Sequence, residues 1–152
     1  MEPLVGVSYL NSKLPDGGNI GFTPEGGVYI TVVNATGSNS VKGTIVSAST
    51  TTNDAVMITP ANSIMPIGVI YENGIANGQP VKVAISGKAY VLMKNGQSAT
   101  RGFWVGCSDN AGRAYMIVDP PSTSLHSSEI GHSLETKTSG TNVLALIDLH
   151  FN

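Results

Sequence analysis

Apolar and polar residues alternate with a period of two through much of the chain, and turn signals interrupt the alternation about every 8–12 residues. Val81, Val83 and Ile85 lie on one face of such a run, and the smaller or polar residues between them lie on the other. Asn73-Gly74 and Asn77-Gly78 reach positive φ at little cost and mark turns before it. No window shows capped helical spacing. The pattern predicts an all-β fold, either a small antiparallel β-sandwich or a barrel.

The alternating runs give the positions of the expected strands. We expect them over residues 28–33, 41–48, 55–59, 81–85, 89–93, 103–107, 113–118, 129–136 and 143–151, with a further short apolar run after Pro66. Ser86-Gly87 is expected to break the chain between two of these strands. The last strand has an unbroken apolar face made by Val143, Ala145, Ile147, Leu149 and Phe151. Because a long hydrophobic edge invites aggregation, we expect this strand to be central or to close a barrel.

The first 26 residues have a different pattern, in which glycines and prolines separate the apolar residues and leave no helical or strand period. Disorder favours low hydrophobicity and high net charge, and this segment has neither. We therefore divide the chain into an extended arm, residues 1–26, and a β-rich domain, residues 27–152. The arm either reaches another subunit or wraps its own domain. Its candidate contact residues are Leu4, Val5, Tyr9, Leu10, Leu14, Ile20 and Phe22.

Composition excludes several classes of function. Charged residues make up 12% of the 152 residues, about half the usual ~25%, and the net charge is −2. A nucleic-acid-binding protein usually carries a basic stripe, so we expect no nucleic-acid partner. No apolar run approaches the ~18 residues of a membrane span, and the first residues lack the pattern of a signal peptide. Cys107 is the only cysteine, which excludes an intrachain disulfide.

The histidines do not form a known catalytic or metal-binding pattern. His126 lies beside serines, but serines are abundant and there is no Gly-x-Ser-x-Gly elbow, so we expect no enzyme. His126 and His132 are six residues apart, which fits neither a helical nor a strand pair. Asp148 and His150 share a strand face and could supply two metal ligands, although a polar strand end or a subunit contact is the simpler interpretation. We expect no metal and no cofactor.

The remaining candidates are acidic residues and one tryptophan. Solvated loop charge explains the acids more simply than paired catalytic carboxylates do, because each stands in or beside a predicted turn: Asp54, Glu72, Asp109, Glu129 and Glu135. Trp104 follows Phe103 on a predicted strand, so one of the two faces away from the main core unless both faces are covered. An exposed Trp104 would mark an interface or a sugar platform, whereas a second packed layer would hide it.

A series of small-residue and turn patterns resembles the capsid decoration (cement) proteins of tailed bacteriophages. The resemblance covers residues 27 to 151 and ends on an Ile-Gly-x-x-Leu-Glu pattern, a glycine turn and a terminal apolar strand. In order, the matching stretches are Gly27-Val28-Tyr29-Ile30, Lys42-Gly43-Thr44-Ile45-Val46, Pro66-Ile67-Gly68-Val69-Ile70, residues 78–87, Gly96-Gln97, Arg101-Gly102, Gly112-Arg113-Ala114, residues 130–135 and residues 140–146.

The resemblance implies a structural virion protein that binds the outer surface of a phage capsid and stabilises the shell. It implies the major capsid protein as a partner, a symmetric homo-oligomer with a trimer favoured, and residence in the host cytoplasm before assembly. It carries no catalytic residues. The alternative is a receptor- or glycan-binding β-module of a phage head fibre or tail, which an exposed Trp104 or Tyr71 would favour.

Overall fold

The structure is a computed structural model, and it describes residues 19–118 and 126–151. These residues form an all-β fold of ten mostly antiparallel strands, which confirms the predicted fold class. None of the described segments is a helix long and apolar enough to cross a membrane. The strands are β1 (Ile20–Phe22), β2 (Gly27–Asn34), β3 (Ile45–Ala48), β4 (Ala55–Ile58), β5 (Gly68–Ile70), β6 (Pro80–Leu92), β7 (Trp104–Cys107), β8 (Ala114–Ile117), β9 (Glu129–Ser133) and β10 (Leu144–Leu149).

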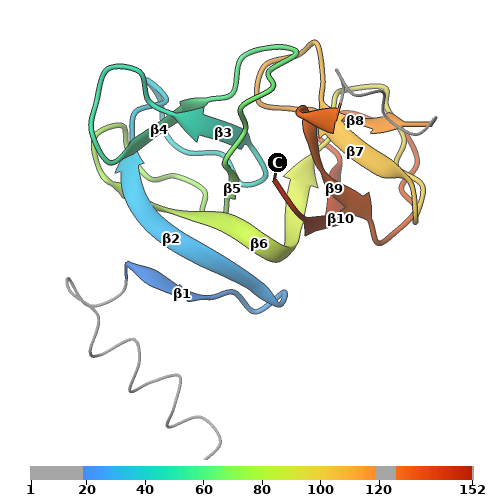
Figure 1. The fold of residues 1–152 in the computed structure, drawn as a ribbon, viewed down its shortest axis with the longest axis horizontal. Helices are drawn as coiled ribbons and strands as arrows, with labels where there is room; N and C mark the ends of the chain where they lie inside the picture. Colours follow the sequence, from blue (N-terminus) through green and yellow to red (C-terminus); the bar gives the residue numbers. More distant parts are fainter. Residues whose placement is uncertain (1–18, 119–125, 152) are drawn as a thin grey trace, which may run out of the picture.

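The strands are arranged in two lobes, with β2 to β5 in one, β7 to β10 in the other, and β6 running through both (Figure 1). In the first lobe the pairing closes on itself. β2 pairs with β4, β4 with β3, β3 with β5, β5 with β6, and β6 pairs back with β2. A ring this small is filled by its own side chains. Its interior holds Val46, Val56, Ile70, Val81 and Val83, none of them more than 1% exposed.

The second lobe continues from the other half of β6. Its strands follow the order β6-β10-β9-β7-β8, and a bridge between Met93 and Ala114 ties the start of β8 back to the end of β6. β10 lies between β6 and β9, which confirms the central position predicted for the last strand. The core of this lobe includes Val91, Met93, Val105, Cys107, Ala114, Ile130, Ala145 and Ile147.

Gly87 is the position at which β6 passes from one lobe to the other. β2 pairs with β6 from Pro80 to Gly87, and β10 pairs with it from Gly87 to Leu92. The predicted break at Ser86-Gly87 is therefore wrong, because the strand bends there and continues. Gly87 has a φ of 73°, and a Cβ on it would lie 2.5 Å from the carbonyl oxygen of Gly26. Only glycine allows both this backbone conformation and this approach.

Two other segments also differ from expectation. Residues 41–44 form a turn instead of the first half of a strand, because Gly43 connects two strands through its backbone. Its amide donates to the Ile70 carbonyl at 2.8 Å, and its carbonyl accepts from the Leu92 amide at 2.9 Å. Within the predicted arm, residues 20–22 form the regular strand β1, antiparallel to β2, although the segment shows no strand period. Pairing with β2 supplies the order that its own sequence lacks.

Replacing Gly87 with alanine should destabilise the fold far more than the same change at a glycine that has positive φ but open surroundings. Gly74, with a φ of 79° and no atom within 4 Å of its Cβ position, is the matched control. We expect Gly74→Ala to lower the free energy of unfolding by about 1 kcal/mol, the cost of the strained backbone alone. Gly87→Ala should lower it by roughly 3 kcal/mol or more, because the backbone of Gly26 must also move. Urea denaturation measures both, and equal losses would contradict the close-approach account.

Candidate functional site

The predicted contact residues are spread over different parts of the structure. Leu4, Val5, Tyr9, Leu10 and Leu14 lie outside the described residues. Ile20 and Phe22 are on β1, with 38% and 57% of their surface exposed, and the buried Gly21 lies between them. Because β1 pairs with β2 on one side, its other side is an edge of the sheet. Trp104 is half-buried on β7, far along the chain from that edge strand.

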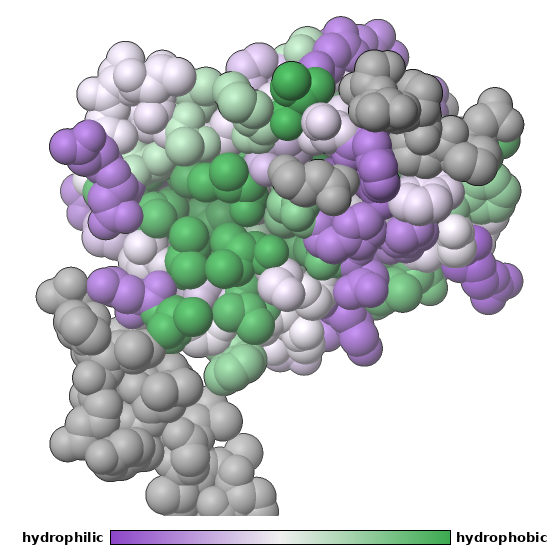
Figure 2. Space-filling model, in the orientation of Figure 1, coloured by the Kyte–Doolittle hydropathy of each residue, from purple (hydrophilic) through white to green (hydrophobic). Residues whose placement is uncertain are grey.

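A second exposed apolar surface surrounds the turn between β4 and β5. Ile64 is 57% exposed and Met65 is 71% exposed, and a hollow of about 250 Å³ lies beside them. Met57 and Pro60 contribute to its lining. Figure 2 shows hydrophobic side chains gathered over the lobe that contains β2 to β5, and mainly hydrophilic ones over the other lobe. On the face shown in Figure 2 the exposed apolar side chains gather over the first lobe, while Val118 and Leu134 are exposed in the second.

The second lobe carries a polar cluster built across three strands. Trp104 on β7 is the register partner of His132 on β9, and His132 is the register partner of Asp148 on β10. Register partners share a face, so these side chains lie in one row. The ring centroids of Trp104 and His132 are 4.3 Å apart. His150 lies two residues beyond Asp148 and returns to the same face.

A bulge in β9 brings Glu129 onto this face. Val105 pairs with Gly131, but the next residue of β7, Gly106, pairs with Glu129, so Ile130 is an extra residue in β9. Glu129 and His132 are three residues apart and would face opposite ways on a regular strand; the bulge removes that difference. Gly131 permits it, because its φ is 151° and a Cβ there would collide with the Asp148 carbonyl.

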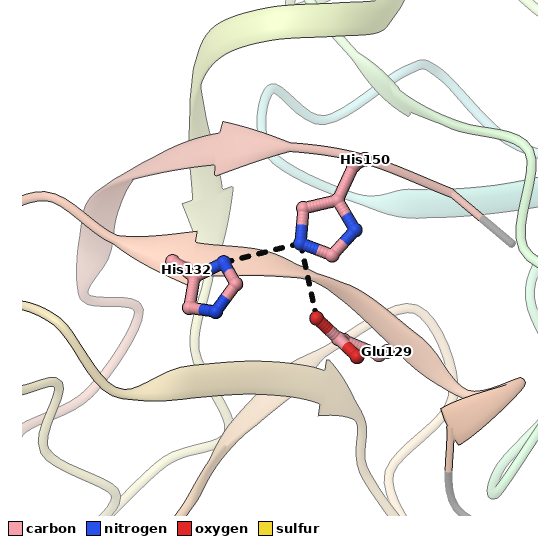
Figure 3. Close-up of side chains that lie close together, drawn as sticks. All are labelled: Glu129, His132 and His150. Atoms are coloured by element: carbon pink, nitrogen blue, oxygen red, sulfur yellow. Dashed lines mark hydrogen bonds and ion pairs between the residues drawn. The ribbon is translucent and has the colours of Figure 1, made fainter. Parts of the chain in front are cut away.

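All three histidines of the chain surround the carboxylate of Glu129, which is fully buried. His126 Nδ1 is 2.7 Å from Glu129 Oε2, and His150 Nε2 is 3.0 Å from Oε1. The same His150 nitrogen is 3.1 Å from His132 Nδ1 (Figure 3). Oε1 lies within ion-pair distance of His150 but has no aligned hydrogen bond. The 3.0 Å separation is compatible with the missing hydrogen bond if His150 has no N–H that points at Oε1.

Sequence reasoning missed this cluster. It paired His150 with Asp148, whereas the structure brings His150 to Glu129 and His132, and Asp148 is exposed. The inference that the histidines do not converge is wrong, because their meeting depends on strand register and a bulge, which spacing does not reveal. The solvated-charge interpretation is also wrong for Glu129. The one trace in the sequence is Gly131 beside His132, a glycine inside a predicted strand, which can mark a bulge.

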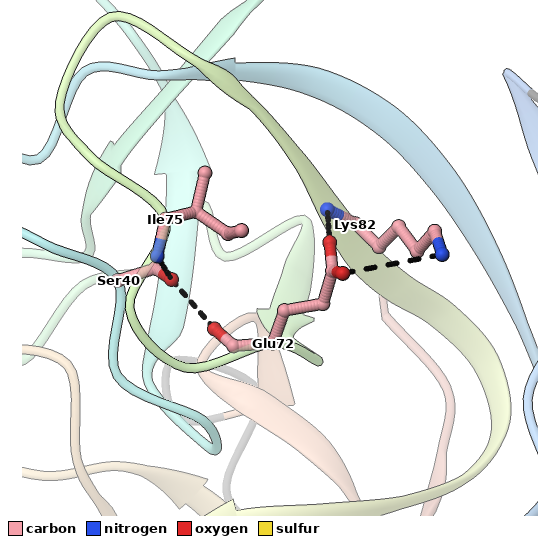
Figure 4. Close-up of polar contacts among 4 residues, drawn as sticks. All are labelled: Ser40, Glu72, Ile75 and Lys82. Carbon is pink, nitrogen blue, oxygen red and sulfur yellow. Dashed lines mark hydrogen bonds and ion pairs between the residues drawn. The ribbon is translucent and has the colours of Figure 1, made fainter.

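Glu72 has a structural role that explains its position beside a turn. One carboxylate oxygen accepts from the Lys82 amide at 3.0 Å, and the other is 3.9 Å from Lys82 Nζ. Ser40 Oγ donates to the Glu72 carbonyl at 2.6 Å and accepts from the Ile75 amide at 2.9 Å (Figure 4). These bonds anchor the loop between β5 and β6 at the end of the first lobe. Both carboxylate oxygens and the carbonyl of Glu72 therefore have partners that hold this loop in place.

Comparisons with known proteins find a similar fold among solved structures. No known family matches the chain, and no curated protein is significantly similar to its sequence. Among solved structures, it is similar to the crystal structure described as head fiber gp8.5 N base in bacteriophage phi29. The TM-score is 0.55, the sequences are 18% identical, and the match covers 80% of this chain and 92% of that one. At this identity the likeness concerns the fold.

Truncating Glu129 should be strongly destabilising, because it removes a buried carboxylate from the imidazoles around it. We expect Glu129→Ala to lower the free energy of unfolding by roughly 2 kcal/mol or more, because it leaves a cavity at a fully buried side chain and removes the contact with His126. The control is Asp109→Ala, because Asp109 pairs with Lys94 at 2.6 Å on the surface. Its melting temperature should stay close to that of the unchanged protein. Thermal unfolding followed by circular dichroism compares the two, and a small shift for Glu129→Ala would show that the carboxylate is not tightly integrated.

Cys107 should be chemically inert while the protein is folded. The thiol is 3% exposed, and burial raises its pKa to about 12. The thiolate is the reactive form, so little of it exists at pH 8. We expect a disulfide-exchange reagent to label no thiol in the native protein at that pH and one per chain in guanidinium chloride. Rapid labelling under native conditions would contradict the buried position.

Proposed function

We propose that the chain is a structural protein of a phage virion that attaches to the outer surface of the head in the manner of a head-fibre base. The observation that carries this proposal is the fold likeness, which extends over 92% of the head fibre base. The likeness therefore concerns the fold as a whole and is not confined to one lobe. The similar protein is described as the N base of a head fiber. This description favours a base that carries a further module, and it speaks against a receptor-binding tip.

The physical properties of the chain support a role in attachment. Two lobes that share one continuous strand make a rigid unit, and a rigid unit loses little conformational entropy when it binds. The net charge is only −2 and charged residues are few, so contact with a shell would depend little on long-range attraction. On a symmetric head, repeated copies or an oligomer would gain avidity from contacts that become intramolecular. We include a homo-oligomer, with a trimer favoured, in the proposal.

Capsid decoration is the second candidate, and the small-residue patterns between residues 27 and 151 favour it. Both candidates place the protein on the outer capsid surface with the major capsid protein as partner. They differ in consequence: a decoration protein strengthens the shell, whereas a fibre base need only hold on to it. Melting empty expanded capsids of the source phage with and without the protein separates them. A clear rise in capsid melting temperature supports decoration, and saturable binding without a rise supports the fibre base.

We place the attachment surface at the N-terminal side, on the segment of residues 1–26. Apolar residues recur along this segment, and its described part presents Ile20 and Phe22 on an edge strand. An exposed edge with large apolar side chains is a natural place for another chain to pair. Because β1 pairs with β2, a truncation that removes the N-terminal segment but keeps the folded domain should end before Ile20 rather than at residue 26. Deleting residues 1–18 keeps this strand.

Polar substitution on β1 should weaken capsid attachment without unfolding the domain. We expect the double variant Ile20→Ser, Phe22→Ser to change the melting temperature little, because both side chains are exposed, and to lose most co-sedimentation with empty capsids. Met65→Ser is the matched control, since Met65 is 71% exposed on a different surface. It should bind like the unchanged protein. If Met65→Ser loses binding and the β1 variant keeps it, the attachment surface lies at the turn between β4 and β5, and this assignment is wrong.

A further inference from the structure

We infer that Glu129, His132 and His150 form a binding site for a divalent transition-metal ion of the zinc class. The inference is independent of the proposed function. Its three ligand atoms come from the two ends of β9 and from the residue after β10, and all lie within 4.8 Å of one another. An ion there would join two neighbouring strands of the second lobe.

The distances suit a zinc-sized ion. His150 Nε2 lies 3.0 Å from Glu129 Oε1 and 3.1 Å from His132 Nδ1 (Figure 3). Ligands about 2.0–2.1 Å from a tetrahedral zinc are separated by about 3.3 Å. Two of the three separations are therefore close to the spacing that coordination requires. The third separation is within 4.8 Å.

The buried carboxylate supplies a second, independent observation. Glu129 is 0% exposed, yet its Oε1 has no aligned hydrogen bond. An unsatisfied buried carboxylate oxygen costs free energy, and a native structure normally gives such an atom a partner. A single N–H on His150 Nε2 cannot point at both Oε1 and His132 Nδ1. A cation between the three atoms would use all three lone pairs at once.

The surroundings resemble those of an ordered metal site. His126 Nδ1 is 2.7 Å from the other oxygen of Glu129, which fixes the orientation of the carboxylate. Trp104 packs against His132 and fixes that ring in turn. Such supporting contacts tune metal affinity. His132 and His150 are half-exposed, so the ion can enter and water can complete its coordination.

The donor set selects the class of ion. Two imidazole nitrogens and one carboxylate oxygen suit Zn²⁺ and its neighbours, whereas Mg²⁺ and Ca²⁺ prefer oxygen ligands. Cys107 is buried in the core and contributes no sulfur. With three protein ligands the ion leaves a coordination position for water, as in zinc sites that are not fully closed.

Zinc titration of the chelator-treated full chain tests the inference. We expect one Zn²⁺ per chain by isothermal titration calorimetry, and a rise in melting temperature of about 5 °C or more at a hundredfold excess over the dissociation constant. Trp104 is the only tryptophan and contacts His132, so its fluorescence should change with the same midpoint. Mg²⁺ should cause neither effect.

Matched histidine variants locate the ion. His150→Gln removes a ligand and should weaken zinc binding at least 100-fold, whereas His126→Gln removes a supporting contact and should weaken it about tenfold. His132→Gln provides a second ligand variant should His150→Gln fold poorly. Cobalt should give visible d–d bands without a thiolate charge-transfer band. Absence of zinc binding, or equal losses in His126→Gln and His150→Gln, would overturn the site.

Discussion

The close approach of two backbones at Gly87 is the constraint on which the rest of the structure depends. At that residue β6 approaches the backbone of Gly26, just before β2, and passes from the closed ring of the first lobe into the strands of the second. A side chain there would separate β2 from β6 and open the first lobe. The last residue of β10, Leu149, pairs with Gly87 as well, so the strain would also reach the second lobe. The lobes are also joined through the larger core cluster, to which the first-lobe strands contribute Ile45, Val69 and Ala84.

The two proposed sites lie in different lobes. The first lobe has a small valine- and isoleucine-filled interior, and it carries the exposed apolar side chains of β1 and of the turn between β4 and β5. The second lobe carries the histidine cluster, which exists because β9 contains one extra residue. The proposed attachment surface and the proposed metal site are thus separate in the fold. Each can be altered without changing the other, which makes the two proposals independently testable.

Much of the fold could be predicted because a half-buried strand imposes a period of two on its sequence. The positions of β2, β4, β7, β8, β9 and β10 follow from that period. The errors have a common origin in tertiary contacts. Gly87 has the sequence signature of a break, and only the neighbouring Gly26 backbone shows that it is a bend. β1 has no period of its own and is ordered by β2.

The candidate site was less predictable than the fold for the same reason. Trp104 stands out in the sequence as a candidate contact residue, but its partner in the structure, His132, is 28 residues away and is defined by register. Glu129 has the sequence context of a loop acid and is nevertheless fully buried. Bulges and register are set by packing between strands, so three-residue spacing such as Glu129 to His132 carries no signal on its own.

The central claim is that this double-lobed domain sits on the outer surface of a phage head. A cryo-electron microscopy map of the source virion tests it most directly. The account predicts density for the two lobes on the exterior of the head, with β1 facing the major capsid protein and the other end of the domain pointing outward. Density for this fold in the tail, or a complete virion in which the protein is absent, would contradict the claim.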